Sequence, residues 1–388
     1  MRIEELNILD WMSIGLLSVL FIVQVYFYAR YMCAVARRLR REKQSGDSCS
    51  TESQTPGVSV ILSAHNEGEN LSNYLQVLLT QDWPEYEVIV VDDESEDNTR
   101  AVIEQYMIHD PRLRFTFVPY GARVGSTKKL ALTLAAKSAR YDYLLLTDAD
   151  CVPESHHWIR EMMQGKKDIV LGFSPYFEEK GIINRIVRYD TLFNGLHYLG
   201  AALCGHPYMG VGRNLAYRKS LFFESGGFSH LMNNKAGDDD LFVNHVATKS
   251  NTAVVLSRES YTYSRSKLRL KEWWQQKRRH LSVAPAYKAS TKIRLTIEPM
   301  TRGLFYAAVI CMIVLYFPTG LVEWPALPFM VAVGLFLIRW IMQSLVINVS
   351  ARKMGQSRFR MFSILWFDIV LPLVTAWMLL IPQKRVKW

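Results

Sequence analysis

The stretch Tyr143-Leu144-Leu145-Leu146-Thr147-Asp148-Ala149-Asp150 decides the fold. Four apolar or aromatic residues that end abruptly in two carboxylates predict a buried parallel strand whose end leaves the core. Side chains at the carboxyl end of such a strand point into the crevice where open α/β sheets bind ligands. Two carboxylates repel each other there unless a cation lies between them, so Asp148 and Asp150 are candidate ligands of Mg²⁺ or Mn²⁺. An ordinary acidic turn after a strand is the alternative that this stretch alone leaves open.

Strands and helices alternate around this stretch. Helices are expected from about Asn70, from the run Glu94–Thr99 and over Gly125–Ser138, and strands are expected over Val58–Leu62, Glu87–Val91 and Leu113–Val118. This order predicts an α/β domain with a mainly parallel sheet and right-handed crossovers. Neither GxxxxGK[ST] nor GxGxxG occurs in the sequence, which excludes a P-loop and a dinucleotide fingerprint.

A second predicted strand also ends in carboxylates. Asp92 and Asp93 follow Glu87–Val91 directly. Either carboxylate can accept hydrogen bonds from the base or ribose of a nucleotide, while Asp148 and Asp150 hold a metal on its diphosphate. Two strand ends with acids predict a nucleotide site more strongly than one.

Two further places belong to the same predicted edge of the sheet. Lys128 or Lys129, near the start of a predicted helix, can contact a phosphate, and a solvated lysine is the alternative for each. The first strand ends at Ala64-His65-Asn66-Glu67. We therefore include Asn66 and Glu67, with Lys128, among the candidate nucleotide-binding residues.

Both ends of the chain are strongly apolar, whereas its middle has a globular composition. Among 388 residues 49% are hydrophobic and the mean hydropathy is +0.02, which is high for an ordinary soluble enzyme. Four stretches are long enough to cross a bilayer; they are Trp11–Met32, Gly303–Val322, Pro325–Val349 and Met361–Ile381. We expect the first to stay as an anchor, because no small-residue cleavage site follows it.

Positive charge gathers beside these apolar stretches. The net charge is +10, and basic residues follow the first stretch at Arg37–Arg41 and precede the last at Arg352–Arg360. This pattern indicates anionic lipid headgroups rather than nucleic acid as a partner, and places both flanks in the cytoplasm. The five cysteines lack a CxxC spacing, so a reducing compartment fits and neither disulfides nor zinc are predicted.

The last apolar stretch contains charge and proline. Asp368 and Pro372 interrupt it, and full crossing would put the basic tail Lys384–Lys387 outside, so spanning and re-entrant courses both stay open. Charged groups within membrane segments usually face each other or a cavity. A bridge between Arg339 and Asp368, or a snorkelling Arg339, is therefore expected.

Five motifs in one order resemble the membrane-bound family 2 glycosyltransferases, which include hyaluronan, chitin and cellulose synthases and ceramide glucosyltransferase. The motifs are Val58–Glu67, Asp92-Asp93-Glu94-Ser95, Asp148-Ala149-Asp150, Gly237-Asp238-Asp239-Asp240 and Gln276-Lys277-Arg278-Arg279-His280. The resemblance implies a GT-A fold in which Asp93 binds the nucleotide of a sugar donor while Asp148 and Asp150 hold the cation. It also implies that Gly210–Tyr217, with Gly212 and Asn214, lines the donor and acceptor pocket; a tight turn is the alternative.

The acidic run Gly237–Leu241 is expected to carry the general base. Its register has two readings: alignment to a Gly-Asp-Asp pattern makes Asp239 the base, and a Thr-Glu-Asp-x-Asp pattern makes it Asp238. We favour Asp239 because that match continues further along the helix. Three adjacent acids cannot all ionise cheaply, so at least one raised pKa is expected. A helix-capping acidic run is the structural alternative.

The segment Gln276–His280 resembles the family's Gln-x-x-Arg-Trp motif. The resemblance assigns Gln276 to this motif and gives Arg279 contact with the leaving diphosphate; the frame of Gln275 with Arg278 is the less favoured alternative. His280 stands where the family has a tryptophan that stacks on the acceptor sugar. This departure favours a single transfer over processive synthesis.

These expectations give five regions and one function. The regions are an N-terminal membrane anchor at 1–35, a basic segment and linker at 36–57, a catalytic domain at 58–263, an amphipathic interfacial segment at 264–300 and a C-terminal membrane region at 301–388. We expect an inverting, metal-dependent transferase in the bacterial inner membrane, facing the cytoplasm, with a UDP-sugar as donor and a lipid or glycan as acceptor. A processive synthase and a non-catalytic nucleotide-sugar-binding scaffold are the alternatives.

Overall fold

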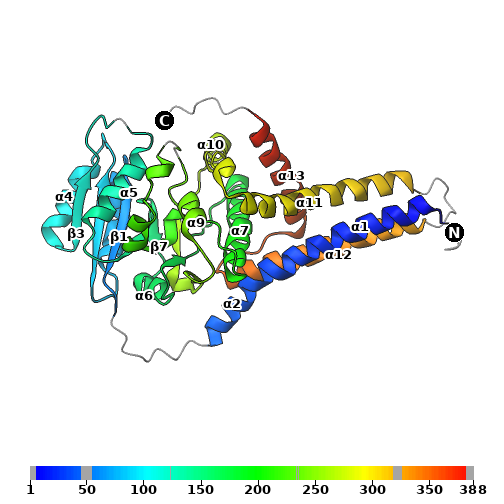
Figure 1. Cartoon of the computed structure of the whole chain (residues 1–388), viewed down its shortest axis with the longest axis horizontal. Coiled ribbons are helices and arrows are strands. Elements are labelled where there is room, and N and C mark those ends of the chain that lie inside the picture. Colours follow the sequence, from blue (N-terminus) through cyan, green and yellow to red (C-terminus); the bar gives the residue numbers. More distant parts are fainter. Residues whose placement is uncertain are drawn as a thin grey trace. The chain divides into compact units, whose positions relative to one another are not determined.

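The computed structural model describes residues 6–44, 55–122, 124–232, 234, 236–317 and 326–381. Residues 45–54 of the predicted basic segment and linker and the whole basic tail Lys384–Lys387 lie outside the described residues. The chain divides into two compact units, a helical unit from its two ends and an α/β unit of Arg37–Lys288 (Figure 1). The helical unit already begins at Ala289, inside the segment that the sequence assigned to the interface.

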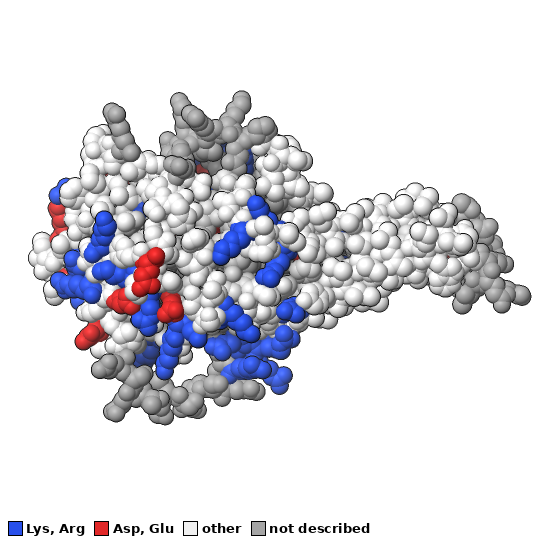
Figure 2. Space-filling model, in the orientation of Figure 1, with Lys and Arg blue, Asp and Glu red and all other residues white. Residues whose placement is uncertain are grey.

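Among the described residues, four helices are long and apolar enough to cross a membrane. They are Ile8–Arg41, which comprises α1 (Ile8–Phe27), a π-helical turn (Tyr28–Met32) and most of α2 (Cys33–Gln44), together with α11 (Ala289–Leu315), α12 (Leu327–Lys353) and α13 (Met361–Leu380). Large apolar side chains such as Ile22 and Leu345 are 63% and 60% exposed. In Figure 2, drawn in the orientation of Figure 1, the surface formed by α1, α11 and α12 at the right of the view shows almost no charged atoms, as expected of a lipid-facing surface.

The last apolar stretch forms one helix. α13 runs from Met361 to Leu380 without a break although it contains Pro372. Asp368 does not interrupt it either, because Arg339 lies 2.9 Å from its Oδ2. The expected ion pair between Arg339 and Asp368 is confirmed.

A seven-stranded sheet forms the centre of the α/β unit, in the order β3-β2-β1-β4-β7-β6-β8. The strands are β1 (Val58–Ala64), β2 (Tyr86–Asp92), β3 (Leu113–Phe117), β4 (Tyr143–Leu146), β6 (Ile169–Leu171), β7 (Leu215–Arg218) and β8 (Thr252–Val254). β1, β2, β3 and β4 are mutually parallel, whereas β7 is antiparallel to both of its neighbours. The prediction of a mainly parallel sheet is therefore confirmed for its first half, which carries the acidic strand ends.

Helices cover this sheet because its strands are apolar on both faces. Every residue of β2 and β4 is buried, as is typical of strands between two layers of helices. α5 packs on β1 and β2, and α3 packs against α4. The helices are α3 (Gly68–Leu79), α4 (Thr99–His109), α5 (Thr127–Ser138), α6 (Trp158–Met163), α7 (Ile182–Leu203), α8 (Lys219–Glu224), α9 (Asp240–Val246) and α10 (Leu270–Leu281).

The predicted amphipathic interfacial segment at 264–300 does not form a single helix. The segment starts with the end of β9 (Thr262–Ser264), which pairs with β5 (Cys151–Pro153) in a second, two-stranded sheet. α10 follows and ends at Leu281, and a 3₁₀ turn at Ala284–Ala286 separates it from α11. Pro285 lies in this turn and lacks the N–H that a continuing helix would need.

Candidate active site

The site is built on the carboxyl ends of three parallel strands. β1 is in register with β2 and with β4, so Ala64 pairs with Asp92 and Ile61 with Leu146. The backbone continues the ladder for one step past each neighbouring strand, because the N–H of Asp93 donates to the carbonyl of Ala64 at 2.7 Å and that of Thr147 to Ile61 at 3.1 Å. The two acidic strand ends therefore meet at one edge of the sheet, as the sequence predicts.

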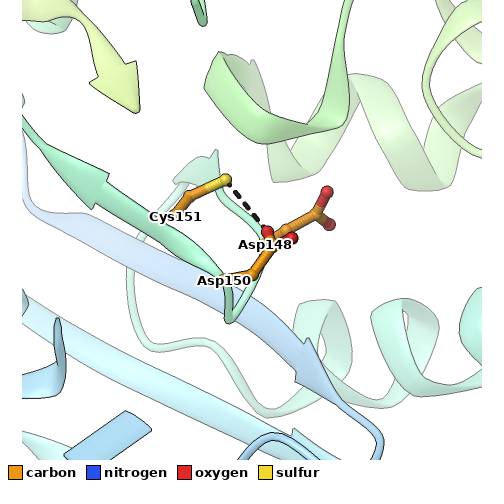
Figure 3. A group of neighbouring side chains, drawn as sticks. All are labelled: Asp148, Asp150 and Cys151. Carbon is orange, nitrogen blue, oxygen red and sulfur yellow. Dashed lines mark hydrogen bonds between the residues drawn. The ribbon is translucent and has the colours of Figure 1, made fainter. Parts of the chain in front are cut away.

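Asp148, Asp150 and Cys151 form a compact group after β4 (Figure 3), and one ligand atom of each lies within 4.8 Å of the others. The Cys151 thiol donates to Oδ1 of Asp150 at 3.3 Å. Burial and the neighbouring Asp148 raise the pKa of Asp150, and a cation between the two carboxylates would relieve this repulsion. Two hard oxygen donors on one turn fit Mg²⁺ or Mn²⁺. The sulfur donor of Cys151 was not foreseen.

Lys128 joins this group to the acidic run. Its Nζ lies 3.1 Å from Oδ1 of Asp148 and 3.2 Å from Oδ2 of Asp238. Desolvation disfavours the ammonium, but Asp148, Asp238 and Asp239 outweigh it and raise the pKa of Lys128. Lys128 is the second residue of α5, which starts at Thr127, near the helix start that the sequence predicts.

Asp93 lies beside the start of the same helix. Thr127 donates its hydroxyl hydrogen to Oδ2 of Asp93 at 3.0 Å, and burial raises the pKa of this carboxyl. Within the described part of the chain, no group donates to the buried Oδ1 of Asp93. An unsatisfied buried oxygen at this place suits a ligand that brings its own N–H or O–H donor. Asp92, in contrast, accepts from the backbone N–H of Ser95 at 3.1 Å and holds the turn after β2.

Asn66 and Glu67 close the end of β1. Asn66 has a φ of 56° and ties two turns together, because its N–H donates to Oγ of Ser95 and its Oδ1 accepts from the N–H of Glu96. Glu67 accepts from the amide of Asn70 at 2.6 Å. Desolvation, together with the charges of Asp150 and Asp148, raises the pKa of Glu67. Glu67 thus lies beside the candidate metal ligands, whereas Asn66 shapes the turn.

The three acids of the run Asp238–Asp240 have separate partners. Lys128 lowers the pKa of Asp238 against the effect of burial. Asp239 accepts from two backbone groups, the N–H of Gly212 at 2.7 Å and that of Asp240 at 2.8 Å. Burial and the adjacent Asp238 raise its pKa to about 6.

Asp240 points away from the other two. Its Oδ2 accepts from the hydroxyl of Tyr287 at 2.9 Å and its Oδ1 from the N–H of Leu241 at 2.7 Å. Burial and the charge of Asp239 raise the pKa of Asp240 to about 8. The expectation of at least one raised pKa in this run is met by two of its three members.

Lys129 holds the loop that leads into the acidic run. Its side chain is fully buried, and Nζ donates to the carbonyl of Leu231 at 2.9 Å, to that of Ala236 at 2.7 Å and to that of Asn234. Lys129 is therefore no phosphate ligand. The two adjacent lysines take different roles because successive helical positions point about 100° apart.

The stretch Gly210–Tyr217 contacts the acidic run through the backbone of Gly212. A Cβ on Gly212 would lie 3.4 Å from Oδ2 of Asp239, an ordinary van der Waals contact, so the hydrogen bond from its N–H to that carboxylate does not by itself require glycine. Asn214 is wholly buried. Its Oδ1 accepts a hydrogen bond from Nε1 of Trp158, and its Nδ2 donates to the carbonyls of Phe173 and Ser260. Asn214 does not line a pocket, contrary to expectation, because each of its polar atoms is engaged in the core.

Arg213, which the sequence did not single out, lies between these two residues in the chain. Its guanidinium stacks on the Tyr176 ring at 4.3 Å and donates to Oγ of Ser264 and the carbonyl of Ser174. The charges of Asp150 and Asp148 help to raise its pKa against the cost of burial. The sequence feature that could have indicated a role for Arg213 is its charge within the otherwise uncharged stretch Gly210–Tyr217.

α10 presents Gln276 and His280 from one face, since residues four apart lie above each other on a helix. Gln276 donates to the Tyr176 hydroxyl at 3.2 Å, which connects it to Arg213. Desolvation and the neighbouring Arg279 lower the pKa of His280 to about 4, although His280 is among the exposed residues of this helix. Arg279 itself is exposed on this helix.

The mostly parallel α/β sheet with carboxylates at a strand end has the GT-A fold of glycosyltransferases. The protein is similar in structure to the mannosyltransferase PcManGT from Pyrobaculum calidifontis, solved in complex with GDP-Man and Mn²⁺, with a TM-score of 0.51 and 18% identity over 87% of this chain and 99% of that one. This similarity shows the fold. The chain belongs to glycosyl transferase family 21, because the model of that family matches residues 17–388.

Two curated relatives are polysaccharide synthases. The poly-beta-1,6-N-acetyl-D-glucosamine synthase of Staphylococcus epidermidis is 36% identical over 104 residues, which are 26% of this chain and 24% of that enzyme. The chondroitin synthase of Pasteurella multocida (strain Pm70) is 25% identical over 134 residues, 32% of this chain and 13% of the synthase. Each match therefore spans a quarter or less of the relative's length. Together with the family match, these relatives confirm the expected resemblance to family 2 glycosyltransferases.

Proposed function

We propose that this glycosyltransferase moves a sugar from a nucleotide diphosphate donor onto a lipid or glycan acceptor at the membrane surface. One observation carries the proposal: a candidate nucleotide carboxylate (Asp93), a candidate metal pair (Asp148 and Asp150) and an acidic run that includes Asp239 converge at one sheet edge. Lys128 spans the gap between the metal pair and the acidic run at 3.1 Å and 3.2 Å. A donor that bridges these groups would have its reacting carbon near the acidic run.

The donor would lie across the strand ends. Oδ1 of Asp93 has no donor among the described residues, so it can accept from a base or ribose, and Lys128 at the start of α5 can bind a phosphate. Asp148 and Asp150 would hold the divalent ion, and Cys151 lies within reach of it. A bound Mg²⁺ or Mn²⁺ would neutralise charge that develops on the leaving diphosphate. The mannosyltransferase solved with GDP-Man and Mn²⁺ supports a nucleotide-sugar donor, and we propose a UDP-sugar first.

Asp239 is the base that we propose. A general base works best when its pKa is near the working pH, and the pKa of Asp239 is about 6. Lys128 lowers the pKa of Asp238, which makes that carboxylate a weaker base, and Asp240 is bound to Tyr287. A single displacement with Asp239 as base would invert the anomeric centre.

Arg279 and Gln276 would act from α10. Gln276 already contacts Tyr176, which carries Arg213 on its ring. We propose that Arg279, exposed beside this face, turns to the leaving diphosphate when a donor binds, because a guanidinium matches phosphate oxygens. Gly212 and His280 would border the acceptor. His280 has a pKa of about 4 and is neutral near pH 7, so it offers a hydrogen-bond partner and not a stacking surface of indole size.

Position at the membrane follows from charge and helix length. Four candidate spans and the basic flanks Arg37–Arg41 and Arg352–Arg360 support a catalytic unit on the cytoplasmic side of a bacterial inner membrane. There it would meet lipid acceptors and nucleotide sugars together.

The test uses the protein in purified membranes with a set of UDP- and GDP-sugars and native lipid extract, with products identified by mass spectrometry. Asp150→Asn should abolish transfer at excess Mg²⁺ or Mn²⁺, and Glu259→Gln, which removes a charge from an exposed position, should keep it. Unchanged turnover in Asp150→Asn would refute the metal assignment.

A processive synthase is the second candidate, favoured by the similarity to the Staphylococcus epidermidis synthase. Product length on a defined acceptor separates the two, because a processive enzyme gives a ladder. A non-catalytic scaffold would bind donors yet fail to hydrolyse or transfer them with metal present.

A further inference from the structure

Lys128 occupies an unusual place for a lysine. It is the second residue of α5, where the helix dipole puts about half a positive charge and disfavours cations. Its side chain is 42% exposed and lies between two carboxylates from distant parts of the chain, Asp148 and Asp238. The neighbouring Lys129 shows what a structural lysine looks like here, with no exposure and three carbonyl partners. The two carboxylates therefore account for the position of Lys128.

The ammonium and a divalent cation at the candidate metal site would share the carboxylate of Asp148. Nζ of Lys128 is 3.1 Å from Oδ1 of Asp148, and Mg²⁺ binds such an oxygen at about 2.1 Å, so both on Oδ1 would stand within about 5 Å of each other. Like charges at that separation repel strongly in a partly buried site. Asp148 is 34% exposed and Asp238 is 14% exposed, so solvent weakens this repulsion without removing it.

We propose that Lys128 competes with the divalent cation for Asp148, so that metal and nucleotide diphosphate bind this protein as a coupled pair. The inference deepens the proposed function, since it rests on Asp148 and Asp150 as metal ligands. A diphosphate brings negative oxygens that give the ammonium a new partner at the start of α5, and the metal then has Asp148 to itself. Asp238 remains a partner of the lysine throughout, which keeps the acidic run attached to the donor side.

The test measures Mn²⁺ binding directly. Free Mn²⁺ is counted by electron paramagnetic resonance with the full chain in detergent, with and without UDP, and with GDP as a second nucleotide. Lys128→Met is the test variant and Lys128→Gln repeats it with a polar side chain. Lys137→Met is the matched control, because Lys137 is exposed in the last turn of the same helix. Asp150→Asn marks binding at the proposed metal site.

For the unaltered protein we expect the nucleotide to tighten Mn²⁺ binding by about tenfold or more, within the usual range of coupling between ligands. Lys128→Met and Lys128→Gln should each bind Mn²⁺ alone about tenfold more tightly, and the gain from nucleotide should shrink accordingly. Lys137→Met should match the unaltered protein.

Two other results overturn the inference in distinguishable ways. If both Lys128 variants bind Mn²⁺ alone no more tightly than the unaltered protein while Asp150→Asn loses binding, the metal site stands and the competition is wrong. If Asp150→Asn binds Mn²⁺ as well as the unaltered protein, the metal site in the proposed function fails, and the competition with it.

Discussion

Asp368→Asn is expected to destabilise the helical unit severely. Asp368 on α13 is 1% exposed, and its carboxylate accepts from Arg302 of α11 at 2.8 Å, from Arg339 of α12 at 2.9 Å and from the Tyr306 hydroxyl at 2.6 Å. Arg339 also donates to Gln24 of α1 at 3.0 Å. This cluster therefore joins the four candidate membrane helices through one carboxylate.

The size of the effect follows from which interaction is lost. Glu298 also accepts from Arg302 at 3.1 Å, so two arginines face two carboxylates and the substitution leaves one guanidinium without a counter-charge. Removal of one partner of a buried ion pair costs about 3–5 kcal/mol, whereas hydrogen bonds between membrane helices average about 0.6 kcal/mol. The charge imbalance dominates, and we expect the free energy of unfolding to fall by about 3 kcal/mol.

The assay is equilibrium unfolding in mixed micelles by titration with sodium dodecyl sulfate, followed by circular dichroism. Asp368→Asn combined with Arg339→Gln removes one charge of each sign and should recover most of the loss. If the free energy of unfolding of Asp368→Asn alone lies within about 1 kcal/mol of that of the unaltered protein, the cluster contributes only ordinary hydrogen bonds. Failure of the double variant to recover stability would show that packing, not charge balance, sets the cost.

Two further predictions concern the acidic run. Because the pKa of Asp239 is about 6 and a base must be deprotonated, kcat/KM should rise as pH increases through 6 and level off above it. A profile that is already level at pH 6 would instead assign the base to Asp238, because Lys128 lowers the pKa of that carboxyl. Lys129→Met removes three charged hydrogen bonds from the loop before the run and should lower kcat on the order of 100-fold, while Lys137→Met on the same helix leaves it unchanged; equal rates for the two variants would contradict the positioning role of Lys129.

The first half of the sheet could be predicted closely because its signals are local. Val58, Glu87 and Tyr143 begin apolar runs bounded by polar turns, and the observed strands start within one residue of these positions. The antiparallel β7 could not be foreseen. Its four residues, Leu215–Arg218, pair with β4 and β6, and such a partner depends on contacts distant in sequence that no local periodicity records.

The same division separates the site residues that were found from those that were missed. Asp93, Asp148 and Asp150 follow strands directly, so topology alone places them together. Arg213 and Tyr176 reach the site through the pairing of β5 with β9, whose Ser264 lies opposite Cys151 and accepts from Arg213. Asn214 was misplaced for a related reason: an asparagine beside glycines looks functional in sequence, but its amide satisfies buried carbonyls.

The acidic run shows why adjacency in sequence does not make residues equivalent. Asp238 faces Lys128 of α5, Asp239 faces the backbone of Gly212, and Asp240 faces Tyr287. Each partner comes from a different part of the chain. The three carboxylates therefore lie in different electrostatic surroundings although they are adjacent in sequence. A lysine lowers one pKa, and burial raises the other two to about 6 and about 8. Asp239 combines intermediate burial with a pKa of about 6 and, among the described residues, has no hydrogen bond from a lysine, unlike Asp238, which lies 3.2 Å from Nζ of Lys128. A general base works best with a pKa near the working pH, which is why we propose Asp239 rather than its two neighbours.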